Sequence, residues 1–329
     1  MSGAGRDAWI AALASLPLAL ASTLLVLALA SRYPGEPLLR YLPRVAGRLA
    51  GASLGGMVVA FLLFNAILSV RDFAELFIIH VLPDTPPLAL ILPMVVLGIA
   101  LINLGIEPLA RLSELFLPVV LVLLVAGLVL VAPEMQPARL LPVLADGYRP
   151  VLRGVLTHWP FWGEVFLWLI LFPAVKDVPS ARRGLLLGTL VAGIFLTAVS
   201  AAVIMTFSAN EAMRFNYPVL ALIRLISVGR FLERVDVLYL SIWFAVNFNR
   251  IALLFLALSL SLRDWLHLGD ATPLALPLGA LVIPLSLTVF DAYPELRQLL
   301  RPELWAPFVL PLELGIPGLV LLADIWRRR

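Results

Sequence analysis

The sequence predicts an all-α, polytopic integral membrane protein. Of its 329 residues, 62% are hydrophobic and only 14% are charged, and the mean hydropathy is +1.02. Soluble domains are about 45–50% apolar and ~25% charged, so a soluble fold is excluded. The apolar residues fall into repeated runs of the ~20 residues that a helix needs to cross a bilayer. We therefore expect one membrane domain over residues 1–329.

Nine spans are expected along the chain, at residues 8–31, 53–80, 88–104, 112–132, 156–175, 185–207, 235–260, 272–290 and 306–325. The first has no cleavage site followed by a soluble domain, so we interpret it as a permanent span rather than a signal peptide. The loop at 32–48 contains four arginines and is expected in the cytoplasm. Residues 215–234 mix apolar and basic side chains, which favours a helix lying in the membrane interface.

The second span contains the first cluster of polar residues at membrane depth. Asn65, Ser69 and Asp72 recur at i, i+4 and i+7 and therefore share one helix face. Arg71 and Glu75 are one turn apart and can form an ion pair. The alternative is a polar seam that only holds helices together.

The fifth span, HWPFWGEVFLWLILFPAVK at 158–176, is interrupted by Pro160, Gly163 and Glu164. Because lipid cannot satisfy free backbone groups, a broken helix survives only inside protein or beside a wet cavity. A carboxylate at membrane depth is costly and marks a candidate functional site. We expect a discontinuous helix beside a small-molecule site, as in inverted-repeat transporters. A kinked helix with Glu164 near the interface remains the alternative.

The seventh span has a second polar face. Its residues Tyr239, Trp243, Asn247 and Arg250 succeed one another at i, i+4, i+8 and i+11. Arg250 lies well inside the span, which is expensive unless it faces a cavity or a carboxylate. A purely structural ion pair is the alternative.

Several classes of function are disfavoured by composition. The chain has no cysteine, which rules out disulfides, thiol catalysis and zinc–thiolate sites, and its three histidines are widely scattered. Its longest basic run is Arg327–Arg329, and the net charge of +3 suits anionic lipid headgroups better than nucleic acid. No nucleophile–base pair or phosphate-binding loop is present, and Glu164 and Asp72 have no histidine partner at useful spacing. We expect no enzyme, no cofactor, no metal and no nucleic-acid partner.

Five stretches occur in a recognisable order. They are SVRDFAELFIIHVLPDTP (Ser69–Pro86), GIEPLARLSELFLP (Gly105–Pro118), LLPVLADGYRPVLRG (Leu140–Gly154), PFWGE (Pro160–Glu164) and FLERVDVLYLSIW (Phe231–Trp243). In this order and spacing they resemble the spore-germination permease family, the B subunits of endospore germinant receptors, within the amino acid–polyamine–organocation transporter superfamily. The resemblance covers essentially the whole chain.

The resemblance implies a LeuT-like bundle of ten helices, arranged as two inverted five-helix repeats. The first helix of such proteins contains an unwound, glycine-containing segment. Here the opening GAGRDAWIAALA resembles the stretch that comes after that helix in the family, so the first helix is expected to be missing. We favour a start codon placed too late over a natural truncation.

The resemblance also implies a nutrient sensor in the inner membrane of the endospore. It would bind a small germinant, typically an amino acid, and signal with an A subunit and a lipoprotein C subunit. We hypothesise a pocket formed by Asn65, Ser69, Phe161, Gly163, Glu164, Tyr239, Trp243 and Asn247. Glu164 would either hold the ligand's ammonium group or balance Arg250. Two alternatives stay open: an amino-acid transporter of the same fold, and a docking subunit without a ligand, helped by the basic helix Phe215–Arg234.

Overall fold

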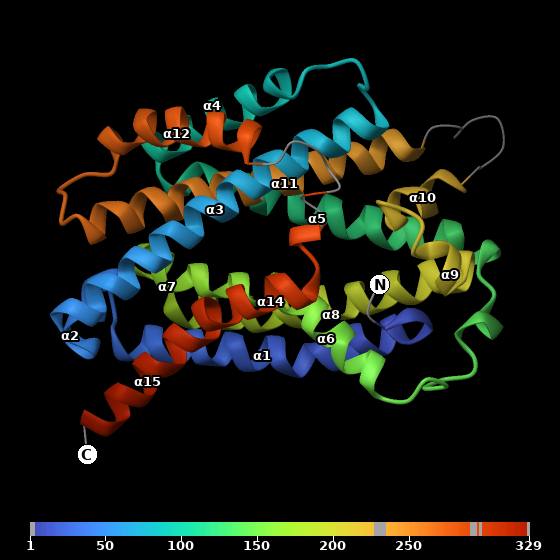
Figure 1. Ribbon diagram of the computed structural model, residues 1–329, viewed down its shortest axis with the longest axis horizontal. Coiled ribbons are helices and arrows are strands. Elements are labelled where there is room, and N and C mark those ends of the chain that lie inside the picture. The colour runs from blue at the N-terminus through green and yellow to red at the C-terminus, as the bar shows by residue number, and fades with distance from the viewer. Residues whose placement is uncertain (1–3, 227–234, 290–294, 296–297, 328–329) are drawn as a thin grey trace.

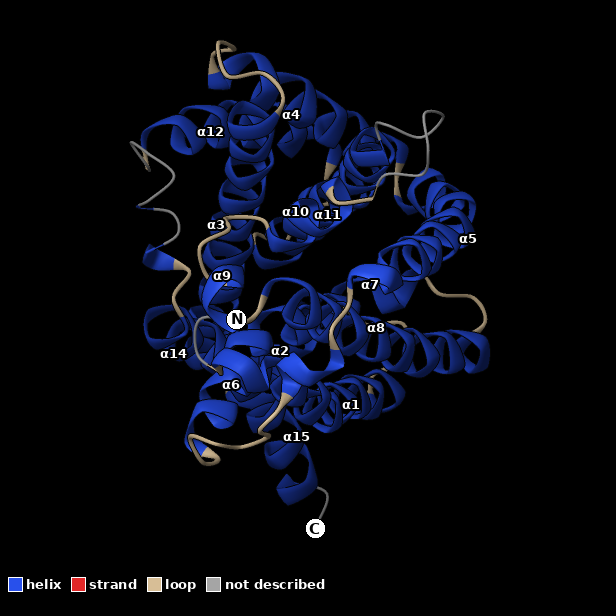
Figure 2. Cartoon of the chain, turned by 90° about the vertical axis from the view of Figure 1, so that its right-hand side faces the viewer, coloured by secondary structure: helices blue, strands red, loops and turns tan. Residues whose placement is uncertain are grey.

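The structure is a computed structural model that describes residues 4–226, 235–289, 295 and 298–327. Within these residues all regular secondary structure is helical (Figures 1 and 2). Eight helical segments of the described chain are long and apolar enough to cross a membrane. The eighth expected span, at 272–290, is present as a shorter apolar helix, Thr272–Thr288. The prediction of an all-α, polytopic membrane protein is confirmed.

The spanning segments lie where the apolar runs predict them. Six consist of one helix each: α1 (Ala8–Arg32), α3 (Arg48–His80), α4 (Pro87–Leu104), α5 (Ile106–Val131), α8 (Val178–Phe207) and α11 (Val235–Trp265). Two are composite. The first consists of α6 (Arg149–Gly163), η4 (Glu164–Leu167), α7 (Trp168–Leu171) and η5 (Phe172–Ala174). The second consists of α14 (Pro302–Leu310), η7 (Pro311–Gly315) and α15 (Ile316–Arg327). Several begin earlier than predicted, because a hydropathy reading omits charged first turns such as those at Arg48 and Glu107.

Shorter elements connect the spans. They are η1 (Gly5–Asp7), α2 (Leu38–Ala46), η2 (Ala132–Glu134), η3 (Pro137–Leu140), α9 (Ala209–Ala212), α10 (Pro218–Arg224) and η6 (Thr272–Leu274), which leads into the shorter apolar span α12 (Ala275–Thr288). Of the described part of the expected interfacial helix, residues 215–226, seven residues are assigned to a helix, in α10. Residues 227–234 of that expectation, including the start of the FLERVD motif, lie outside the described residues.

Two glycines allow one-residue connections between consecutive helices. Gly47 joins α2 to α3 with φ of 91°, and Gly105 joins α4 to α5 with φ of 78°. Side chains with a Cβ rarely adopt such backbone angles, whereas glycine does so without strain. The connection between the spans expected at 88–104 and 112–132 is thus reduced to a single residue, and the helix resumes at Ile106.

The spanning helices form two groups (Figures 1 and 2). We call α3, α4, α5, α11 and α12 the upper group, because they lie in the upper half of Figure 1. The lower group is α1, α6–α7, α8 and α14–α15. The largest buried apolar cluster draws residues from both groups, including Phe61 of α3, Phe166 of η4 and Phe255 of α11. This shared cluster therefore holds the two groups together.

The packing pairs helices in chain order. The spans α1, α3 and α4 pack against α8, α11 and α12, respectively. Each early helix therefore meets the helix that occupies the corresponding place later in the chain. This is the arrangement expected of two structural repeats related by a two-fold axis. Between the paired spans lie short helices in both halves, α2 in the first and α9 and α10 in the second.

Helix α5 is the most exposed of the spans. Its described residues include large apolar side chains facing outward, among them Leu115, Val122 and Val129. A soluble protein rarely exposes an apolar surface of this extent. In a bilayer the same surface contacts lipid tails, so α5 lies at the periphery of the bundle.

Candidate ligand site at a mid-membrane ion pair

Glu164 and Arg250 form an ion pair between the two helix groups. The Arg250 Nε donates to both carboxylate oxygens of Glu164, at 3.0 and 3.2 Å, and the Nη2 also contacts Oε1. Glu164 belongs to the lower group and Arg250 to the upper group. Each lies near the midpoint of its span, Arg149–Ala174 and Val237–Trp265, respectively. The pair therefore links the two groups at the centre of the membrane.

The pair is only partly enclosed. The side chains of Arg250 and Glu164 keep 31% and 25% of their surface accessible. Charged side chains in membrane spans face the bundle interior or a water-filled cavity, because exposure to lipid is costly. A bidentate guanidinium–carboxylate contact presents one cationic and one anionic group side by side.

The expected discontinuity in the helix around Glu164 takes the form of a local tightening. The α6 helix does not open at Gly163; instead it tightens into the 3₁₀ helix η4, with Gly163 at φ −68° and ψ −23°. Pro160 lies one turn before this point, within α6. The chain stays helical because tighter i→i+3 bonds still satisfy the backbone. The helix therefore changes type at this point without exposing free backbone ends, and side chains rather than backbone groups provide the charge here.

A second carboxylate, Glu313, lies against the same turn. It belongs to the π-helical turn η7 within the last span and is only 4% exposed. A Cβ added at Gly163 would overlap the Glu313 Oε2, so Gly163 leaves the space that this carboxylate occupies. Glu313 also lies within electrostatic range of Glu164 and Arg250. It was not among the site residues predicted from the sequence, although a carboxylate in the middle of an apolar span was a sufficient signal.

The charges of α3 form a separate ion pair nearby. Arg71 Nη2 lies 2.7 Å from the Glu75 Oε1, and both side chains are buried. The predicted i, i+4 pairing is therefore confirmed. Asp72 accepts a hydrogen bond from the Tyr217 hydroxyl at 3.5 Å and is within electrostatic range of Arg250. Tyr217, which precedes α10, was not among the predicted site residues.

The two uncharged polar residues of α3 are buried. Asn65 donates from its amide nitrogen to the Phe61 carbonyl of its own helix at 3.3 Å. The Ser69 hydroxyl makes no hydrogen bond within the described part of the chain. Neither residue contacts the Glu164–Arg250 pair through a hydrogen bond in this structure.

The predicted residues of α11 divide between two places. Tyr239 and Trp243 line an apolar groove of about 600 Å³ between α5, α8, α10 and α11. Trp243 also stacks on Phe73 of α3, with ring centroids 5.9 Å apart. Asn247 donates to the Trp243 carbonyl at 2.9 Å. Of the predicted polar face of α11, only Arg250 takes part in the ion pair with Glu164.

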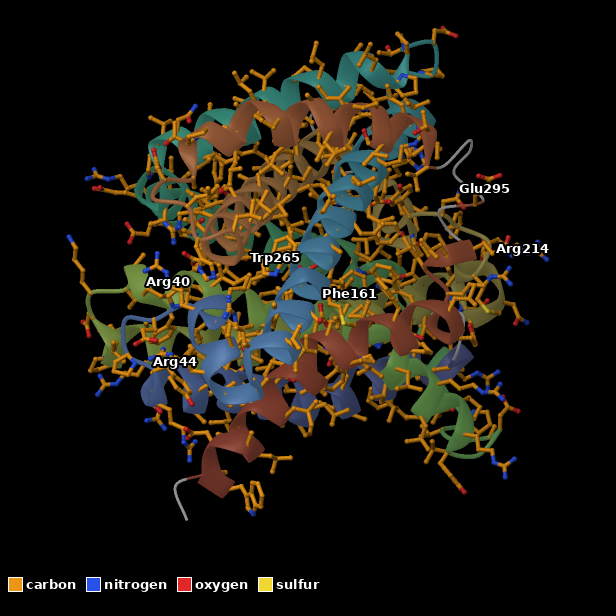
Figure 3. All side chains as sticks on the ribbon, turned by 60° about the vertical axis from the view of Figure 1, so that its left-hand side comes forward. Arg40, Arg44, Phe161, Arg214, Trp265 and Glu295 are labelled. Atoms are coloured by element: carbon orange, nitrogen blue, oxygen red, sulfur yellow. The ribbon has the colours of Figure 1, made fainter. Side chains whose placement is uncertain are left out.

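Phe161 lies apart from the other predicted residues. Its side chain is 67% exposed and is labelled in Figure 3. The next residue, Trp162, instead points into the lower group, where its indole donates to the Ser15 hydroxyl of α1 at 2.8 Å. The structure thus brings together Gly163, Glu164 and Arg250, adds Glu313, and leaves Phe161 at the surface.

The fold and the site define an integral membrane protein of the transporter-like class, with a charged centre between two helix groups. The sequence profile of the spore germination protein family, a permease-type family, matches residues 1–292. The chain belongs to this family.

Three relatives show the extent of the similarity. The chain is 27% identical to spore germination protein KB of Bacillus subtilis over 332 residues, covering 100% of this chain and 89% of that protein. It is 25% identical to spore germination protein YndE of the same species, covering 98% and 88%. It is 27% identical to spore germination protein XB of Bacillus anthracis, covering 76% and 70%. The protein is therefore an integral membrane protein of spore-forming bacteria, and its family is of the permease or receptor type.

Proposed function

We propose that this protein is the B subunit of a spore germinant receptor and that it binds a small nutrient germinant, an amino acid, at the Glu164–Arg250 pair. The observation that carries the proposal is the position of this pair. It lies near the middle of two spans, links the two helix groups and remains partly accessible. An amino acid has an α-carboxylate for Arg250 and an α-ammonium for Glu164.

The remaining predicted ligand residues complete the proposal. Asn65 and Ser69 would supply hydrogen-bonding groups from α3, and Ser69 has a buried hydroxyl to offer. Asn247, about one turn from Arg250, would contribute from α11, whereas the structure places the predicted Tyr239 and Trp243 at the apolar groove instead. Gly163 would keep the backbone of the lower group close to the ligand.

Binding at an inter-group ion pair offers a route to a signal. A ligand that inserts its two charges between Glu164 and Arg250 replaces a direct link between the groups with a longer, bridged one. Such a ligand stabilises whichever arrangement of the groups binds it better, by the difference in its affinity for the two arrangements. In the endospore inner membrane, an A subunit and a lipoprotein C subunit would receive this change. Family membership supports this assignment.

Ligand-induced thermal stabilisation tests the proposal. The full chain, purified in lipid nanodiscs, would be heated with each of a panel of single amino acids. A ligand at about 100 times its Kd stabilises the folded state by about 2.7 kcal/mol. We expect at least one amino acid to raise the midpoint, and Arg250→Lys and Glu164→Gln to abolish that rise. Arg111→Lys and Glu107→Gln, in the exposed pair of α5, are the matched controls.

Two outcomes would replace the proposal with its alternatives. If no amino acid shifts the midpoint of the intact protein, the chain is a docking subunit without a ligand of this class. If proteoliposomes accumulate a labelled amino acid in response to an ion gradient, the protein is a secondary transporter. Binding without accumulation, lost on substitution of Arg250, is the result expected of a sensor.

A further inference from the structure

Glu313 is a buried carboxylate with an unused oxygen. It lies in η7, near the midpoint of the span Glu303–Trp326, and is 4% exposed. Its Oε2 makes no hydrogen bond within the described residues. The residues around it form a π-helical turn, a feature that is rare in proteins and frequent at functional sites. The described chain therefore keeps an acidic group at membrane depth without a direct partner.

The charged groups around Glu313 are few in the part of the chain that the structure describes. From the elements packed against η7, Glu164 of η4 faces it, and Arg250 of α11 lies within electrostatic range. On α3, Arg71 and Glu75 neutralise each other, and Asp72 acts on Arg250. The titratable groups of the neighbouring α14, α15 and α6 are engaged elsewhere or exposed: Asp324 pairs with Arg32, His158 bonds the Gly154 carbonyl, and Glu303 is at the surface.

The described charges at this point of the membrane do not balance. One guanidinium, that of Arg250, lies within electrostatic range of three carboxylates, Glu164, Asp72 and Glu313, and it is already bound bidentately by Glu164. An ionised Glu313 would thus be a buried charge without a direct partner, which is strongly unfavourable. A bound metal ion would need several ligands, and the described residues contain no group of three or more acidic or histidine side chains placed to hold one. The smallest cation that removes the imbalance is a proton.

We propose that Glu313 is a proton-binding site, coupled to the Glu164–Arg250 pair. The proton stays on Glu313 while Arg250 is bound to Glu164. When Glu164 loses its charge or its hold on Arg250, the guanidinium becomes available to Glu313, which then releases its proton to solvent. Glu164 and Glu313 thus compete for the Arg250 guanidinium, and when Arg250 is paired with Glu164 the proton is bound to Glu313. This inference does not depend on which molecule the protein senses.

Infrared spectroscopy of the purified full chain in nanodiscs measures the proton directly, by comparing the wild type with variants at one fixed pH. A protonated carboxyl gives a C=O stretching band that a carboxylate lacks. We expect the difference spectrum of wild type minus Glu313→Gln at neutral pH to contain this band. Glu303→Gln, an exposed carboxylate of the same span, should leave the band unchanged. Unaltered thermal unfolding of Glu313→Gln would show that the variant is folded.

The coupling is tested by Glu164→Gln. In this variant the Glu313 band should disappear at the same pH, because Arg250 is free to pair with Glu313. A difference spectrum that contains only carboxylate bands for Glu313 in the wild type would overturn the proton site. Persistence of the Glu313 band in Glu164→Gln would overturn the coupling to the ion pair.

Discussion

Arg71 and Glu75 form an ion pair one turn apart in α3, closed within the upper helix group. The Nη2–Oε1 distance is 2.7 Å, and Arg71 also donates to the Ser286 carbonyl of α12 at 3.3 Å. Both side chains are buried. The pair neutralises itself and ties α3 to α12, so it differs from the Glu164–Arg250 pair, which bridges the two groups.

Neutralising one partner of this pair should be costly. In Glu75→Gln, Arg71 keeps a buried charge that has lost its counter-charge, and removing one partner of a buried pair costs about 3–5 kcal/mol. Thermal unfolding of the purified protein measures the loss. Glu107→Gln removes the same i, i+4 contact from the exposed pair with Arg111 and should change stability by about 0.5 kcal/mol or less. Equal effects of the two variants would contradict the structural role of burial.

The Glu164–Arg250 pair should contribute less to stability than the α3 pair. Its side chains are partly accessible, so water screens part of the attraction. A double-mutant cycle with Glu164→Gln and Arg250→Met should give a coupling energy of about 0.5–3 kcal/mol, the range for contacting residues. The measurement is again thermal unfolding, without ligand. A value near zero would mean that the two side chains are not paired in the membrane.

Gly163 should tolerate no side chain. A methyl group at this position would overlap the Glu313 carboxylate, so either Glu313 or η4 must move. Overpacking of this kind costs about 1–3 kcal/mol. Gly318→Ala, in α15 of the same region, meets nothing within 4 Å and should be neutral or stabilising. The double variant Gly163→Ala with Glu313→Ala should recover part of the lost stability, and failure to do so would place the clash elsewhere.

Ser15 should contribute to the stability of the fold through its hydrogen bond with Trp162 of α6. It is buried and accepts the Trp162 indole N–H at 2.8 Å, joining α1 to α6. Ser15→Ala leaves that donor without its acceptor, which costs about 1–3 kcal/mol. Ser22→Ala is the control on the same helix, because the Ser22 hydroxyl only bonds the Leu18 carbonyl. If both variants unfold alike, the Trp162 bond does not hold the helices together.

The sequence predicted the helices well because a bilayer demands long apolar runs. It also identified Glu164 and Arg250 as charges inside membrane spans, but residue spacing alone did not show that the two side chains form an ion pair with each other. The face shared by Tyr239 and Arg250 is real, yet the two residues are about 16 Å apart along the helix at 1.5 Å per residue. They therefore meet different neighbours, the apolar groove and the ion pair.

Two backbone features escaped prediction. Proline and glycine flank the turn at Glu164 and favour unwinding, but 3₁₀ bonds keep it helical. The π-helical turn at Pro311–Gly315 depends on how α14 and α15 pack against η4 and α3, which no local pattern reveals. The length of the last span predicts that it crosses the membrane, but length alone does not show that Glu313, at its centre, belongs to the site.

The π-helical turn has a consequence for comparing this protein with its relatives. A π turn holds one residue more than an α-helical turn, and one residue corresponds to about 100° of rotation around the axis. The side chains of α15 are therefore rotated by that angle from where a helical wheel continued from α14 would place them. A relative with a one-residue deletion between Pro311 and Gly315 and an unbroken α-helix there would keep its aligned α15 side chains in the same directions, whereas a relative of equal length with an unbroken α-helix would have them rotated by about 100°.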